Sequence, residues 1–275
     1  MWQKFKNGFQ MDRISKKFKQ LKDKKKALSI FLTLGFPNLK MTEKLVLALE
    51  ESGADLFEIG MPFSDPIADG PAIQQSSEIA LKNGVEWKHL IQLGKNLRKK
   101  TDVPLILMSY SNPLYHKGWN KSAKDLKTAG FDGVILPDLI PEENEEAKNA
   151  FTKYDLSLVH LVAPTSGEAR VKRITKECSG FVYTVSVTGV TGARKELPVK
   201  EVSNFLKIVK KNSSLPVLLG FGISKPEQLS NFQEADGFII GSALVEILLQ
   251  KKEDALLIEE AKKFINSFAK SRFIV

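Results

Sequence analysis

The chain has 275 residues, of which 43% are hydrophobic, so it is long enough and apolar enough to bury one large core. Its net charge is +9 at pH 7, but residues 1–26 carry +8 of that charge, and the nearly neutral remainder argues against a nucleic-acid-binding protein. No apolar run approaches the ~18 residues of a membrane span, no signal-peptide pattern opens the chain, and the only cysteine is Cys178, so we expect a cytoplasmic protein without an internal disulfide.

Residues 1–26 are a basic N-terminal extension, with ten Lys or Arg residues and two acidic ones. Ile14, Phe18 and Leu21 are spaced i, i+4 and i+7, which predicts an amphipathic helix. We expect its apolar face to cap the fold and its lysines to face solvent. A membrane surface or an acidic partner is the alternative for the basic face. The sequence leaves open whether Met1 or Met11 is the true start.

Beyond the extension, short apolar runs alternate with longer amphipathic stretches. The runs predict strands at 28–34, 56–60, 104–109, 133–137, 156–162, 181–186, 216–220 and 238–241. The amphipathic stretches predict helices at 41–52, 72–83, 86–100, 123–129, 142–153, 168–178, 199–211, 226–232 and 243–269. Strands that are apolar on both faces suit a parallel sheet covered by helices. Eight such units predict one (β/α)8 TIM barrel domain over 1–275, and a doubly wound open sheet is the alternative.

Three carboxylates lie in the stretch FEIGMPFSDPIADGP at 57–71. Glu58 stands among apolar residues near the end of a predicted strand, where burial raises the pKa of a carboxyl group and suits it to acid/base work. The alternative is a Glu turned outward to a helix lysine. Asp65 and Asp69 follow on a loop stiffened by three prolines, and Asp69 is also placed to cap the next helix. A metal site of Glu58, Asp65 and Asp69 is a further alternative.

Three clusters of small residues follow the last three predicted strands: TGVTGAR at 188–194, GFGIS at 220–224 and GSA at 241–243. Loops at these places, with a helix N-terminus, form the recurring phosphate site of barrel enzymes. Glycine lets the backbone approach an anion, and free N–H groups favour negative charge. The alternative is that these glycines only turn the chain. Gly189 and Gly192 also give the first loop the composition of a mobile lid.

From about Lys26 to its C-terminal helix, the chain resembles the alpha subunit of tryptophan synthase. The resemblance is carried by TLGFP at 33–37, EIGMPFSDPIADGP at 58–71, YTVSVTGVTGAR at 183–194, GFGIS at 220–224 and GSA at 241–243. It implies a barrel that cleaves indole-3-glycerol phosphate into indole and glyceraldehyde 3-phosphate. It also implies a heterotetramer of two alpha and two beta subunits, with pyridoxal phosphate in the beta subunit and no cofactor or metal in this chain.

The resemblance assigns roles to single residues. Glu58 matches the acid/base, Asp69 matches the carboxylate that interacts with the indole N–H, and Thr191 matches a lid threonine that closes toward Asp69. The phosphate cradle matches Gly192, Phe221, Gly222, Gly241 and Ser242. Tyr183 matches a tyrosine of the same pocket as Asp69. Phe31, Tyr110 and Asp138 fall where the family lines its substrate pocket or its subunit contact.

The reaction that the resemblance implies is consistent with these residue types. In a retro-aldol cleavage the indole C3 gains a proton and the adjacent hydroxyl loses one, so one carboxyl group that cycles between acid and base serves both steps. A second, ionised carboxylate stabilises positive charge at the indole nitrogen. No lysine in these motifs suggests a Schiff base. Another phosphate-binding barrel enzyme, or an inactive barrel that binds a phosphorylated ligand and regulates a partner, stays as an alternative.

Overall fold

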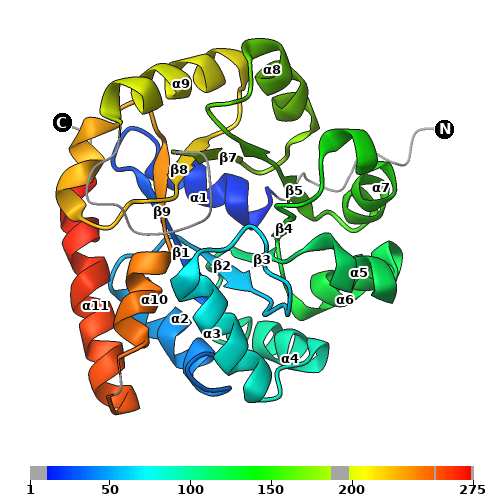
Figure 1. Ribbon diagram of the computed structural model, residues 1–275, viewed down its shortest axis with the longest axis vertical. Coiled ribbons are helices and arrows are strands. Elements are labelled where there is room, and N and C mark those ends of the chain that lie inside the picture. The colour runs from blue at the N-terminus through cyan, green and yellow to red at the C-terminus, as the bar shows by residue number, and fades with distance from the viewer. Residues whose placement is uncertain (1–10, 187–197, 251, 274–275) are drawn as a thin grey trace.

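Parallel strands form a ring at the centre of the computed structural model, which describes residues 11–186, 198–250 and 252–273 (Figure 1). The sheet order is β5-β4-β3-β2-β1-β9-β8-β7-β6. Its two ends, β5 and β6, are separated only by His160, so they are halves of one interrupted strand that closes the ring. The strands are β1 (Ala27–Thr33), β2 (Leu56–Gly60), β3 (Leu105–Met108), β4 (Gly133–Ile135), β5 (Ser157–Val159), β6 (Leu161–Val162), β7 (Val182–Val185), β8 (Val217–Gly220) and β9 (Gly237–Ile240).

The eight predicted strands and the (β/α)8 barrel are therefore confirmed, and the open-sheet alternative is wrong. The sheet closes because the first strand, β1, pairs in parallel with the last strand, β9, as well as with β2. The predicted strand 156–162 is broken at His160, and several strand ends differ from the predicted ones, as in β4, which ends at Ile135 instead of 137.

Apart from α1 (Arg13–Leu21), which lies across one end of the ring, the helices surround the ring on its outer side (Figure 1). The surrounding helices are α2 (Met41–Glu51), α3 (Pro71–Lys82), α4 (Trp87–Leu97), α5 (Ser111–Lys117), α6 (Trp119–Ala129), α7 (Glu145–Lys153), α8 (Glu168–Glu177), α9 (Val199–Asn212), α10 (Ser242–Leu248) and α11 (Asp254–Ser271), with two 3-10 turns, η1 (Pro141–Glu143) and η2 (Pro226–Asn231). Within the described ranges, no helix has the length and apolar character to cross a membrane.

Three helix predictions need correction. The predicted helix 243–269 is two helices, because Glu253 adopts an extended conformation and caps a new helix, α11. The predicted helix 226–232 is the 3-10 turn η2, and the segment 142–153 begins within the 3-10 turn η1. Helix α5 was not predicted, because its seven residues, SNPLYHK, have no apolar periodicity.

In most strands, alternate residues belong to two different hydrophobic clusters. In β2, Phe57 and Ile59 belong to the cluster between strands and helices, whereas Leu56 belongs to the cluster inside the ring. Glu58, which lies between Phe57 and Ile59, therefore shares the inner face with Leu56. Every residue of β2 is buried.

Helix α1 closes the end of the ring where the strands begin. Ile14 and Leu21 are buried in the inner cluster, with Phe18 packed against it. The Asp12 carboxylate caps the helix by accepting from the backbone N–H of Ser15 at 2.9 Å. Arg13 donates to Asp132, just before β4, at 3.0 Å. The predicted capping helix is thus confirmed for these residues.

Candidate active site

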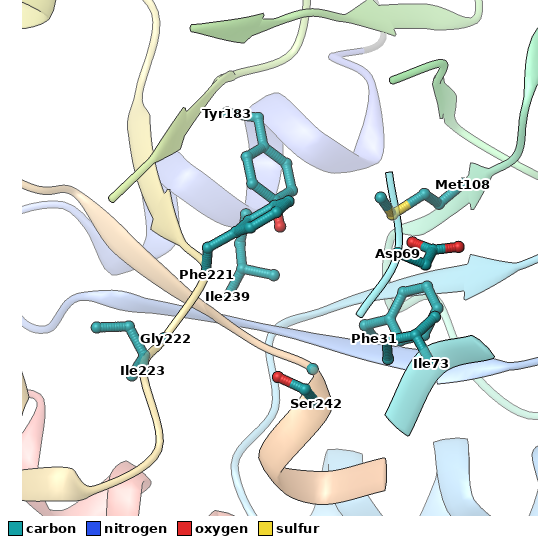
Figure 2. A pocket seen from close by; sticks show the side chains of 11 residues that line it. Phe31, Asp69, Ile73, Met108, Tyr183, Phe221, Gly222, Ile223, Ile239 and Ser242 are labelled. Carbon is teal, nitrogen blue, oxygen red and sulfur yellow. The ribbon is translucent and has the colours of Figure 1, made fainter. Parts of the chain in front are cut away.

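A pocket opens where the strands end (Figure 2). Asp69, Phe31 and Met108 lie on one side of it, and Tyr183 and Phe221 lie on the other. Its lining comes from segments far apart in the sequence, namely Phe31, Asp69, Ile73, Met108, Tyr183, Phe221, Gly222, Ile223, Ile239, Gly241 and Ser242. The barrel therefore brings together most of the residues that the sequence singled out.

Glu58 lies inside the ring, completely buried, and is not part of the pocket lining. Its Oε1 accepts a hydrogen bond from the Ser29 hydroxyl at 2.7 Å, while Oε2 is buried without a hydrogen-bond partner. Burial raises the pKa of Glu58 to about 7, and the Ser29 hydrogen bond lowers it only in part. The outward-facing alternative is wrong. This carboxyl group is instead poised between its acid and base forms near neutral pH.

Asp69 lies at the rim of the pocket, on the loop between β2 and α3. Its side chain does not cap α3, because Gly70 is the N-cap residue and Pro71 begins the helix. Burial raises the pKa of Asp69 to about 6, and a hydrogen bond with the Tyr110 side chain partly offsets this rise. Both carboxyl groups thus have raised pKa values. Asp69 has the lower value of the two, so it is mostly ionised at neutral pH while Glu58 is not.

Asp65 does not join the two other carboxylates. It is exposed and accepts a hydrogen bond from its neighbour Ser64 at 2.5 Å. Across the described part of the chain, no group of three or more His, Cys, Asp or Glu residues could hold a metal ion. The metal site of Glu58, Asp65 and Asp69 is therefore wrong.

Two aromatic residues reach the pocket because glycine stands opposite them. A Cβ atom on Gly60 would lie 2.4 Å from the Phe31 ring, and one on Gly220 would lie 2.6 Å from the Tyr183 ring. Any side chain at either glycine would displace the ring. Burial raises the pKa of the Tyr183 hydroxyl, and the nearby charges of Glu58 and Asp69 raise it further. Tyr183 is therefore a neutral hydrogen-bonding group.

The glycine clusters after β8 and β9 meet at one side of the pocket (Figure 2). Phe221 and Gly222 both have positive φ angles, 65° and 78°, which turn the chain sharply after β8. Gly241 and Ser242 begin α10, where the first N–H groups have no partner inside the helix. Gly189, Thr191 and Gly192, which were predicted to form a lid and part of the phosphate cradle, lie outside the described residues.

A second, larger cavity adjoins the pocket and shares Asp69, Met108 and Phe221 with it. Its wall includes His160, which the sequence reasoning missed. The His160 side chain is hydrogen-bonded to Asn144 at 2.9 Å, and burial lowers its pKa to about 4, so it is neutral. Met108, Ile73 and Ile239 were missed as well. Met108 and Ile239 are ordinary apolar residues of strands and Ile73 is an apolar residue of α3, so nothing in the sequence sets them apart from the core.

The family model that matches this chain describes the tryptophan synthase alpha chain, and it covers residues 18–271. The chain belongs to the tryptophan synthase alpha chain family. It is 44% identical over 259 residues to the tryptophan synthase alpha chain of Caldanaerobacter subterraneus subsp. tengcongensis, which covers 94% of this chain and 98% of that protein.

Solved structures agree with the sequence comparison. Tryptophan synthase subunit alpha of Legionella pneumophila is 34% identical with a TM-score of 0.86, covering 95% of this chain and 98% of that one. Tryptophan synthase of Mycobacterium tuberculosis is 32% identical with a TM-score of 0.86, covering 96% and 99%. Members of the tryptophan synthase alpha chain family are lyases that cleave indole-3-glycerol phosphate. They carry no cofactor themselves and form complexes with a beta subunit, which holds pyridoxal phosphate.

Proposed function

We propose that Glu58 is the acid/base and Asp69 the charge-stabilising carboxylate in the cleavage of indole-3-glycerol phosphate by this chain. The observation that carries the proposal is the burial of Glu58 inside the ring with one oxygen unpartnered. An unpaired polar atom in a dry core is costly, and a catalytic role is one explanation for its presence. Glu58 lies directly beside Phe31 of the pocket lining in the β1–β2 register.

The proposed reaction conserves protons. Protonated Glu58 delivers its proton to C3 of the indole, which places positive charge on the ring nitrogen next to ionised Asp69. The Glu58 carboxylate then takes the proton of the glycerol hydroxyl adjacent to C3. The bond between C3 and the side chain breaks, its electron pair returns to the indole, and the aldehyde forms. Indole and glyceraldehyde 3-phosphate leave, and Glu58 is protonated again.

The proposal requires a movement of Glu58. Its side chain is hydrogen-bonded to Ser29 and is not part of the pocket lining, so we expect it to turn toward the pocket when substrate binds. The rotation gives up a single neutral–neutral hydrogen bond when Glu58 is protonated, which costs about 1 kcal/mol. Substrate binding readily supplies that amount.

The phosphate group of the substrate is assigned to Gly222, Gly241 and Ser242, with Phe221 beside them. The turn after β8 and the first turn of α10 present backbone N–H groups and the Ser242 hydroxyl at one side of the pocket. Phe31, Tyr110 and Tyr183 are assigned to the indole and glycerol parts. Thr191 and Gly192 stay predictions from the resemblance.

The test is indole release from indole-3-glycerol phosphate by the purified full-length chain, for wild type, Glu58→Gln and Asp69→Asn. Each variant should lose at least about a hundredfold in rate. Asp65→Asn is the matched control, because Asp65 is an exposed acid on the same loop as Asp69. Retention of more than about a tenth of the rate by Glu58→Gln would reject its role. No cleavage by wild type, alone or with a beta subunit, would favour another phosphate-binding barrel or an inactive regulatory one.

We further propose that the chain acts as one domain, in the cytoplasm, within a heterotetramer of two alpha and two beta subunits. The single closed sheet supports one domain. Membership in a biosynthetic family whose alpha and beta chains work together supports the assembly and its location.

A further inference from the structure

The hydroxyl group of Tyr110 joins two loops at the rim of the pocket. Tyr110 lies between β3 and α5, and its Oη accepts a hydrogen bond from the backbone N–H of Ala68 at 2.9 Å. This bond places the Tyr110 hydroxyl beside Asp69, the next residue of the loop between β2 and α3, and both side chains line one hollow at the rim. The Tyr110 hydroxyl lowers the pKa of the Asp69 carboxyl group, as a hydrogen-bond donor does. The Tyr110 ring stacks on Phe63 of that loop, with ring centres 5.1 Å apart. One side chain thus contacts the beginning and the end of the Asp69 loop.

The directions of these hydrogen bonds follow from the chemistry of a phenol. The Ala68 N–H can only donate, so it occupies a lone pair of the Tyr110 oxygen. The single hydroxyl hydrogen of Tyr110 is then available to the Asp69 carboxylate, which at neutral pH is mainly an acceptor. Burial raises the pKa of Tyr110, and the charge of Asp69 raises it further, so the phenol keeps this hydrogen at physiological pH.

Tyr110 is itself held in place from the following loop. Asp138, after β4, accepts from the backbone N–H of Ser111 with both carboxylate oxygens, at 2.9 and 3.0 Å. The Ser111 hydroxyl donates to Asp138 at 2.7 Å. The Ser109 hydroxyl donates to the carbonyl oxygen of Tyr110 at 2.9 Å. These bonds hold the backbone on both sides of Tyr110, and the stacking on Phe63 and the Ala68 N–H bond hold its ring and hydroxyl.

We propose that Tyr110 is a positioning residue. Its hydroxyl donates a hydrogen bond to the Asp69 carboxylate and so orients that carboxylate, whose remaining lone pairs then face the pocket. The inference rests on the proposed role of Asp69 in the reaction. Tyr110 touches no reacting atom in this scheme. Its contribution is to hold an ionised carboxylate at a fixed place beside the indole nitrogen, where a displacement of about 1 Å would be costly.

The positioning role has a pH signature. The hydrogen bond from Tyr110 stabilises the ionised form of Asp69, so removing it raises the pKa of Asp69 above about 6. The titratable groups that face this carboxylate are Tyr110, from the loop after β3, and Tyr183, from β7. The charge of Glu58 also raises the pKa of Tyr183. Asp138 acts on Tyr110 from the loop after β4. Tyr110 has no part in setting the pKa of Glu58, which burial and Ser29 determine.

The experiment measures kcat and KM for indole release between about pH 5.5 and about pH 8.5, with wild type and Tyr110→Phe. Loss of a hydrogen bond to a charged group should lower kcat about tenfold near pH 7. KM should stay within about twofold, because the aromatic ring remains. The acidic limb of the kcat profile should move to higher pH, so the loss near pH 6 exceeds the loss near pH 8.

Tyr115→Phe is the matched control, because Tyr115 lies in α5, is 63% exposed and should show the wild-type profile. Thermal unfolding of each variant confirms that it is folded over the pH range. A Tyr110→Phe enzyme with wild-type kcat and profile would overturn the inference, as would one that loses the same factor at every pH. Wild-type activity of Asp69→Asn would instead reject the proposed function of Asp69, whatever Tyr110→Phe does.

Discussion

Replacing Glu58 by Gln should change the pH dependence of folding stability as well as the rate of cleavage. Glu58 is completely buried, and burial raises its pKa from 4.5 to about 7. The amide of the variant fills nearly the same space and still accepts a hydrogen bond from Ser29. Unlike the carboxyl group, it never has to be charged inside the ring. Wild type and variant therefore differ in one titration only.

The size and direction of the effect follow from proton binding in the two states. Below about pH 4.5, Glu58 is protonated in both the folded and the unfolded chain. Between that pH and about pH 7, the folded chain holds a proton that the unfolded chain has released, so wild-type stability falls as pH rises. At 1.36 kcal/mol for each pKa unit, the total loss is about 3 kcal/mol, complete above about pH 7. The Glu58→Gln variant lacks this loss, so its stability relative to wild type should rise by that amount.

The assay is urea unfolding of both proteins at intervals from about pH 4.5 to about pH 8.5, with the difference in unfolding free energy plotted against pH. Subtracting wild type from variant cancels the other titrating groups, Asp69 included. Glu201→Gln removes an exposed acidic group from α9 and controls for the change in net charge. Parallel stability curves for Glu58→Gln and wild type would show that Glu58 does not carry a raised pKa, and the acid/base assignment would lose its physical basis.

Three further predictions concern other parts of the molecule. Gly222→Val should weaken binding of glycerol phosphate about tenfold or more, because a β-branched residue is strained at φ 78°, and titration calorimetry measures this. Arg13→Ala should lower the free energy of unfolding by about 1 kcal/mol without changing kcat, because Asp132 keeps its ion pair with Arg98. Urea unfolding measures this, with Lys16→Ala as the control at an exposed position. A beta subunit should raise indole release several-fold, and equal rates with and without it would contradict this.

The strands could be predicted from the sequence because each is a short apolar run bounded by polar residues. The sequence could not predict whether the Glu58 side chain points into the ring or toward the helices. Strands buried on both faces have apolar residues at every position, as Leu56, Phe57 and Ile59 show, so the pattern does not tell the inside of the ring from the outside. Only the closed ring, with Ser29 of the neighbouring strand as hydrogen-bond partner, decides it.

Contacts between loops could not be predicted from the sequence either. Tyr110 and Asp69 are about forty positions apart, and nothing in either motif indicates that a phenol holds the carboxylate. The division between α10 and α11 was hidden because apolar spacing continues on both sides of the break. The sequence could predict that the glycine clusters after β8 and β9 line the same pocket, because the ends of parallel strands meet at one edge of the sheet.

The ion-pair cluster of Arg13, Asp132 and Arg98 lies at the end of the ring where the strands begin, opposite the pocket. Asp132 also accepts from the backbone N–H of Leu105 at 2.9 Å, so the cluster ties α1 to the start of β3. An engineer who wants higher heat tolerance can therefore randomise this end, and one who wants a different substrate can randomise the loops at the other. Residues at the two ends share few contacts. Changes in stability selected at one end and changes in activity selected at the other should therefore add when they are combined in one chain.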